Sequence, residues 1–225
     1  MGMPYYVSPE QMMQDKAEYA RKGISRGRSS IAMEYEEGIL LFADNPSSLN
    51  KISEIYDRIA FAGAGKYGEF ESLRKAGIRH TDMTGYLYSR EDVTVRSLAN
   101  AYSQTIGSVF SQEMKPLEIE ILVVEVGASA KENGIYRIQF DGSIYDEKSF
   151  SVIGGKSEDL AEALKTHYEL TTLKGAIRLC LEALGVANNP NLDPQLFEVA
   201  VLDRKQSGRQ FQRLRSEALA AYFQA

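Results

Sequence analysis

The chain has 225 residues, 44% of them hydrophobic, which is enough apolar material for a full core, and one globular domain over residues 1–225 is expected. Its formal net charge of −5 argues against a nucleic-acid or anionic-membrane partner held by bulk charge. The single cysteine, Cys180, excludes a disulfide framework, and without a signal-peptide pattern or an apolar run of about 18 residues a cytoplasmic location is expected.

The first predicted element is an amphipathic helix over residues 9–26. The Ser8 hydroxyl can cap an early amide, Pro9 suits the first helical position, and Gln11 can reach back to complete a capping box. The apolar residues that follow recur at helical spacing and predict one buried stripe: Met13, Ala17, Ala20 and Ile24.

Short strands follow this helix directly. Residues 31–35 have the two-residue periodicity of a strand, Glu36-Glu37-Gly38 form a tight turn, and residues 39–42 return. Two further strands are predicted over residues 52–56 and 59–64. Helices are then predicted from Gly65 to about Ile78 and from about Val93 to Glu113.

The second half of the chain repeats this order of strands and then paired helices. The predicted strands cover residues 118–126, 134–140 (before a turn at Asp141-Gly142) and 149–153, and the helices cover 158–168 and 171–184. A last hairpin pairs residues 196–202 with 210–214 before a short terminal helix. Runs of strands separated by helix pairs predict an α+β fold, in which antiparallel sheets are layered and helices pack outside them.

One glycine motif suggests a cofactor. Residues Gly63-Ala64-Gly65-Lys66-Tyr67-Gly68 read GxGxxG between a predicted strand and a helix, with Asp82 nineteen positions after Gly63, a pattern typical of dinucleotide binding. A dinucleotide-binding unit needs a parallel strand after its first helix, whereas a second helix is predicted here. A dinucleotide-binding oxidoreductase therefore remains only an alternative, and no cofactor is expected.

The residues that usually carry hydrolytic chemistry are scarce. Only His80 and His167 are present, both in charged helical segments, and no GxSxG motif lies near either. Cys180 lies in an apolar helical pattern and is expected to be a buried, inert thiol. Two histidines and one cysteine give no zinc spacing, so no catalytic residue and no metal site are predicted.

Several segments together resemble the α-type subunits of the proteasome core particle, most closely the bacterial, actinobacterial type. They are Ser8-Pro9 to Glu18-Tyr19-Ala20, the hairpin ending in Asp44-Asn45, and Lys51-Ile52 leading to Ile59–Gly63. The resemblance covers nearly the whole chain. It implies a four-layer αββα sandwich of two antiparallel sheets, as in N-terminal-nucleophile (Ntn) hydrolases, and seven-membered outer rings that cap catalytic β rings.

The resemblance also implies a non-catalytic subunit. Catalytic β-type relatives use an N-terminal threonine that is released by cleavage after glycine and lies at the start of the first strand. Here that strand is predicted to begin near Arg28-Ser29-Ser30, a helix precedes it, and the chain contains no Gly-Thr dipeptide. An autonomous Ntn-type amide hydrolase remains an alternative and would need a processed Thr, Ser or Cys terminus.

Two functional sites follow from the resemblance. A pocket between adjacent α subunits would accept the C-terminal carboxylate of a ring-shaped ATPase activator, and its residues would be Lys51, Gly65, Glu18 and Tyr19. A flexible segment over residues 1–8 would gate the axial pore through which unfolded protein substrates pass, and the gate would comprise Met3, Pro4, Tyr5, Tyr6, Val7, Ser8 and Pro9. The implied partners are other copies of the chain, a β-type subunit and the ATPase, without nucleic acid or membrane.

Overall fold

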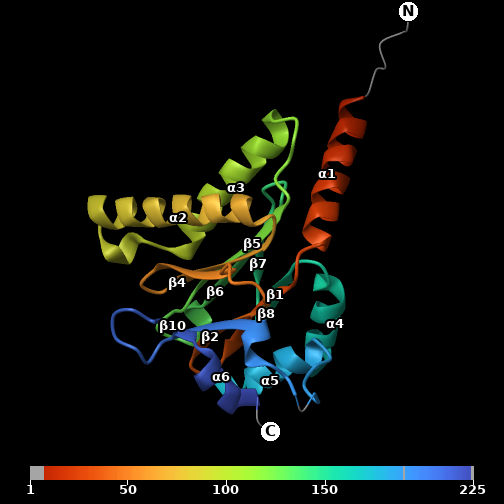
Figure 1. Cartoon of the computed structure of the whole chain (residues 1–225). Helices are drawn as coiled ribbons and strands as arrows, with labels where there is room; N and C mark the ends of the chain where they lie inside the picture. The colour runs from red at the N-terminus through yellow and green to blue at the C-terminus, as the bar shows by residue number, and fades with distance from the viewer. Residues whose placement is uncertain (1–7, 190, 224–225) are drawn as a thin grey trace, which may run out of the picture.

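The computed structural model of this chain describes residues 8–189 and 191–223 (Figure 1). Two five-stranded antiparallel sheets lie face to face between helices, which confirms the predicted four-layer α+β sandwich. The gate residues Met3, Pro4, Tyr5, Tyr6 and Val7 lie outside the described residues, whereas Ser8 and Pro9 lie within them.

One sheet joins strands from three separate segments of the chain, and the other is formed by five consecutive strands. The first contains, in spatial order, β10 (Phe211–Leu214), β9 (Phe197–Asp203), β2 (Gly38–Asp44), β1 (Ser30–Tyr35) and β8 (Phe150–Ile153). The second contains β3 (Ile52–Tyr56), β4 (Ile59–Gly65), β5 (Ile119–Glu125), β6 (Gly134–Ile138) and β7 (Ile144–Glu147).

The helices cover the outer faces of the sheets. α2 (Tyr67–Leu87) and α3 (Val95–Gln112) pack on the second sheet, and α4 (Ser157–His167), α5 (Leu173–Ala183) and α6 (Ser216–Phe223) pack on the first. α1 (Pro9–Ser25) lies over the end of β4 and β5. Short 3-10 turns are η1 (Arg90–Asp92), η2 (Ala130–Glu132) and η3 (Pro194–Leu196). No described helix is both long and apolar enough to cross a bilayer.

The layer between the two sheets is rich in small side chains. Its fully buried alanines are Ala32, Ala43, Ala60, Ala62, Ala64 and Ala200, and they come from both sheets. Small inward-facing side chains let the two sheets approach closely, and larger ones such as Leu41, Leu122 and Phe211 fill the rest of the layer. The layers between the sheets and the helices carry most of the buried aromatic residues, such as Phe61 and Phe70 on one side and Phe42 on the other.

The start of α1 is capped as predicted, but only in part. The Gln11 backbone N–H donates to the Ser8 hydroxyl at 3.2 Å, and Pro9 occupies the first helical turn. The Gln11 side chain donates instead to Asp15 one turn further on, at 2.7 Å. Among the contacts of the described residues only the Ser8 half of the predicted capping box is present, and the Gln11 NH2 group links the first turn of α1 to the next through Asp15.

The buried stripe of α1 is shorter than predicted. Ala20 and Ile24 are buried and pack against Phe140, whereas Met13 is 41% exposed. Figure 1 gives the reason, since the N-terminal half of α1 projects beyond the sandwich. The helical period of the apolar residues was interpreted correctly, but this chain buries only the second half of the helix.

Two further elements differ from the prediction. α2 continues to Leu87 rather than ending near Ile78, because its last turns pack on η1 and bury Thr81. The hydroxyls of Thr81 and Thr84 bond back to carbonyl oxygens one turn earlier, which satisfies them within the helix. Strand β7 was missed. It is the edge strand that pairs with β6, and its side chains are half-buried or exposed, so it lacks the apolar alternation of a typical strand.

Candidate functional site

Lys51 lies beside the point where the first strand begins. It directly precedes β3, and its carbonyl accepts the Gly63 backbone N–H of the neighbouring strand at 3.0 Å. Its ammonium group donates to the carbonyl oxygen of Arg28, two residues before β1. The side chain therefore spans from the second sheet to the opening of the first.

A buried carboxylate holds the backbone of this lysine in place. Glu198, on β9, is 8% exposed and accepts the backbone N–H groups of Lys51 at 2.7 Å and Ile52 at 3.2 Å. It also accepts the Asn45 side-chain amide at 2.8 Å and pairs with Arg213. One carboxylate thus ties three segments together, and the sequence analysis gave it no role.

The charge state of Lys51 depends on the same surroundings. Burial lowers its pKa to about 8, while the Asp44 and Glu198 carboxylates oppose that shift and Arg28 adds to it. Both carboxylates are already paired with arginines, Asp44 with Arg28 at 2.8 Å and Glu198 with Arg213. Among the described residues, Lys51 is left with a carbonyl contact and no ion pair, so it can bind an anionic group that enters from outside.

Gly65 has a structural requirement of its own. Its φ is +97°, and a Cβ there would lie 2.0 Å from the Glu118 carbonyl oxygen, which accepts the Lys66 backbone N–H at 2.9 Å. A Cβ on Gly27 would in turn lie 2.9 Å from the Gly65 nitrogen. The linker after α1 therefore passes directly over the end of β4, and only glycine fits there.

The dinucleotide alternative does not match this fold. β4 pairs antiparallel with both of its neighbours, β3 and β5, and α2 is followed by α3 rather than by a parallel strand. A Cβ on Gly63 would lie 2.6 Å from the Phe70 ring, so this glycine serves the packing of α2 on its sheet. The motif lacks the parallel sheet that a dinucleotide-binding unit requires.

The four predicted pocket residues fall into two places. Lys51 and Gly65 flank the linker of residues 26–29, whereas Glu18 and Tyr19 are exposed on α1. The Tyr19 ring faces Lys115, whose ammonium nitrogen lies 5.8 Å from the ring centroid. Within one chain the structure brings together only the first two.

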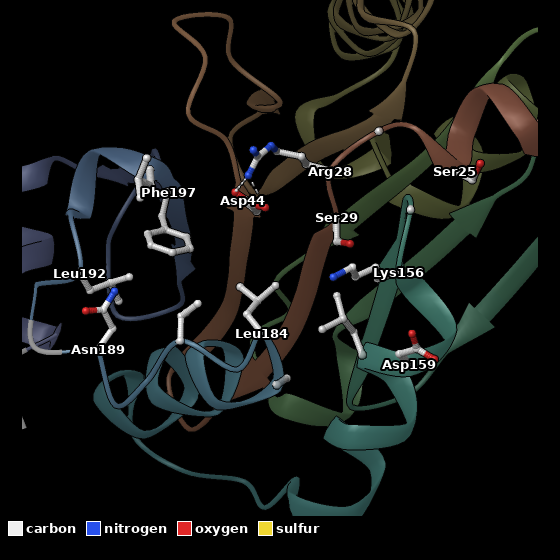
Figure 2. Close-up of a pocket in the computed structure, with 16 residues that line it drawn as sticks. Ser25, Arg28, Ser29, Asp44, Lys156, Asp159, Leu184, Asn189, Leu192 and Phe197 are labelled. Carbon is white, nitrogen blue, oxygen red and sulfur yellow. Dashed lines mark hydrogen bonds and ion pairs between the residues drawn. The ribbon is translucent and has the colours of Figure 1, made fainter.

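A cavity of about 780 Å³ is lined in part by this linker, and Figure 2 shows its lining. The Arg28–Asp44 ion pair, Lys156 and Asp159 lie around it, with Leu184 and Phe197 among its apolar lining residues. This cavity was not predicted from the sequence. The sequence feature that marks this cavity is Gly154-Gly155. The Gly155 N–H donates to the Gly27 carbonyl at 2.9 Å, and a Cβ on Gly154 would lie 2.8 Å from the Arg28 carbonyl oxygen.

The start of β1 lacks the parts of a nucleophilic site in the described residues. Ser29 is buried at 7% exposure, and the seventeen-residue helix α1 precedes it in the chain. His80 and His167 lie in helices, as predicted, on α2 and α4, and both are exposed. Cys180 is fully buried, which confirms the predicted buried thiol, and burial raises the pKa of its thiol.

The two antiparallel sheets form a sandwich with the Ntn-hydrolase architecture. The first strand continues from a helix, so in the described residues this subunit has no free nucleophile at the start of that strand. The family model for the proteasome subunit matches residues 24–202, and the chain therefore belongs to the proteasome subunit family, as an α-type subunit of the core particle. This confirms the resemblance found in the sequence.

Similar proteins agree with this assignment. The proteasome subunit alpha of Thermobifida fusca is 51% identical over 228 residues, covering 100% of this chain and 92% of the relative. That of Actinosynnema mirum is 52% identical over 233 residues, covering 100% and 89%. That of Frankia casuarinae is 53% identical over 231 residues, covering 97% and 96%.

Proposed function

We propose that this chain forms the seven-membered outer rings of a proteasome core particle and caps rings of catalytic β-type subunits in the cytoplasm. The ring gates the entry of unfolded protein substrates and docks a ring-shaped ATPase through the C-terminal tails of that ATPase. The chain itself is non-catalytic, and it uses no cofactor, nucleic acid or membrane.

The observation that carries the docking proposal is the state of Lys51. It is a half-buried ammonium group whose neighbouring carboxylates are both committed to arginines. A chain-end carboxylate that reaches it forms a charge-assisted contact in a partly desolvated place. Gly65 has no side chain to cover the adjacent backbone. The exposed Glu18 and Tyr19 of a neighbouring copy are available to complete the pocket.

Assembly with a β-type subunit tests the proposed function as a whole. Purified alone, the chain is expected to keep its encoded N-terminus by mass spectrometry and to hydrolyse no peptide. Co-expressed with an actinobacterial β-type subunit, it is expected to form a much larger particle by light scattering, and that particle cleaves peptides. A trimmed terminus with activity in the isolated chain would favour the autonomous hydrolase, and a chain that stays monomeric beside the β subunit would refute ring formation.

Deleting Gly2–Val7 tests the gate. Ser8 is kept because its hydroxyl caps α1. If residues 1–8 and Pro9 obstruct the pore, the deletion is expected to raise the peptide hydrolysis rate of the α/β particle several-fold. The equilibrium affinity of a reversible β-site inhibitor serves as the control, because it does not depend on entry rate and should stay unchanged. An unaltered hydrolysis rate would contradict gating by this segment.

A further inference from the structure

The cavity of about 780 Å³ between the start of α4 and the end of α5 has the size and the lining of a small-molecule site (Figure 2). Ligand sites usually enclose about 300–1,000 Å³ and combine apolar walls with a few polar groups that fix the orientation of the ligand. We call this one the α4–α5 cavity. Lys51 is not among its lining residues, so a ligand here occupies a different place from the proposed docking site of the ATPase tail.

Ser29 brings a buried hydroxyl group to the α4–α5 cavity. The residue is 7% exposed, and its carbonyl oxygen accepts the Asp44 backbone N–H at 3.1 Å, which fixes its position. Its hydroxyl lies at the cavity (Figure 2) and makes no hydrogen bond within residues 8–189 and 191–223. Buried polar groups in native proteins nearly always have a partner, so this hydroxyl has a hydrogen bond to offer to a molecule that enters.

Lys156 adds a positive charge that has no counter-ion in the described part of the chain. It is the N-cap residue of α4, and its ammonium group points into the cavity (Figure 2). The two aspartates of the lining are compensated in other ways. Asp44 pairs with Arg28 at 2.8 Å, and Asp159 lies in the first turn of α4, where the helix N-terminus stabilises negative charge. A carboxylate therefore supplies the charge that this cavity lacks.

The opposite wall of the cavity is apolar. Leu184 follows α5, Leu192 lies in the loop before η3, and Phe197 begins β9, and all three side chains are half-buried. The Phe197 ring is held between two other rings, with its centroid 5.3 Å from that of Phe42 and 5.5 Å from that of Phe223. The wall is thus part of the packed layer outside the first sheet, and it suits an apolar tail.

We propose that the α4–α5 cavity binds a small monocarboxylic acid with an apolar tail. The carboxylate accepts hydrogen bonds from the Lys156 ammonium group and the Ser29 hydroxyl, and the tail lies against Leu184, Leu192 and Phe197. Both halves of the ligand are needed, because Lys156 is exposed and an exposed charge contact contributes little by itself. The site goes beyond the proposed gating and docking roles and does not depend on them.

Isothermal titration calorimetry of the full chain with octanoate tests the site. Octanoate is expected to bind one site per chain. Octanamide has the same tail without the charge and is expected to bind about threefold to fivefold more weakly. Each methylene group removed from the acid is expected to weaken binding about fourfold while the tail stays within the cavity. Equal affinities for octanoate and octanamide, or for octanoate and butanoate, would overturn the proposal.

Substitutions in the lining place the ligand. Lys156→Met keeps an apolar stem and removes the charge, so octanoate is expected to bind about threefold to fivefold more weakly. Leu184→Ala removes part of the apolar wall and is expected to weaken binding about tenfold. Lys165→Met is the matched control, because Lys165 is exposed on the same helix and is not among the lining residues. Equal affinities of the two lysine variants, each with the circular dichroism spectrum of the parent chain, would overturn the proposal.

The same chemistry occurs in free aliphatic acids and at the C-terminus of a short peptide. N-acetylleucine carries a chain-end carboxylate beside a branched apolar side chain and represents the second source. Tighter binding of octanoate would assign the site to aliphatic acids, and tighter binding of N-acetylleucine would assign it to peptide termini. Either result agrees with the proposed class of ligand, whereas the absence of binding by both at millimolar concentration would refute it.

Discussion

Lys51→Ala is expected to weaken binding of the activator's C-terminal tail by about 30-fold or more, the effect of removing one partner from a partly buried charged contact of about 2 kcal/mol or more. Among the described residues no other lysine or arginine combines this position at the start of β1 with the absence of an ion pair, since Arg28 is already paired with Asp44. The measurement is the affinity of a tail peptide for the assembled particle, together with ATPase-stimulated degradation. Ring formation should stay intact.

The pH dependence distinguishes the charge of Lys51 from its shape. Because burial lowers its pKa to about 8, tail binding is expected to fall as the pH rises through 8. Stability moves in the opposite direction. Between pH 8 and the ordinary lysine value the unfolded chain holds a proton that the folded chain does not, so the free energy of unfolding rises with pH there. Lys51→Arg stays protonated and should give a flat binding profile. A falling profile in that variant, or normal docking by Lys51→Ala, would contradict the assignment.

Glu198→Ala is expected to lower the free energy of unfolding by about 3–5 kcal/mol, the usual cost of breaking a buried ion pair from one side. The substitution leaves Arg213 without its carboxylate and removes the acceptor for two backbone N–H groups, those of Lys51 and Ile52. Urea unfolding of the isolated chain, followed by circular dichroism, measures the loss.

A surface ion pair provides the control for this experiment. Glu54 pairs with Arg209, whose side chain is 68% exposed, so Glu54→Ala should cost less than about 1 kcal/mol. If both variants lose the same small amount, Glu198 does not anchor the site. If Glu198→Ala also weakens tail binding while Lys51 is still present, the carboxylate positions that lysine.

Local patterns predicted most of the architecture. Ser8-Pro9 and the apolar period identified α1, and the alternation of strands and helix pairs identified the layers. Both patterns involve residues that are close together in the sequence, so they can be recognised without knowledge of the tertiary structure. The exposure of the N-terminal half of α1 could not be predicted, because the spacing of apolar residues does not show where a helix extends beyond the surface on which it packs.

The candidate site was harder to predict, because its parts are distant in the sequence. Glu198 occupies an ordinary strand position, and the backbone N–H of Lys51 that it binds lies 147 residues away. A second cavity, between α1 and the end of α3, likewise joins residues 12–19 to residues 111–116. Lys51 itself was identified only through the family resemblance, since a lysine before a strand has no distinguishing local pattern.

The alanine layer between the sheets has a mechanical consequence. Adding even one or two methyl groups at Ala60, Ala62 or Ala64 would force the sheets apart, because closely packed interiors have no spare volume. Such a slab bends little, so a push from an ATPase tail bound as proposed above would tilt it as a unit. If the proposed gating is correct, movement in the described part of the chain should be concentrated in the projecting half of α1, which has fewer contacts with the sandwich to break.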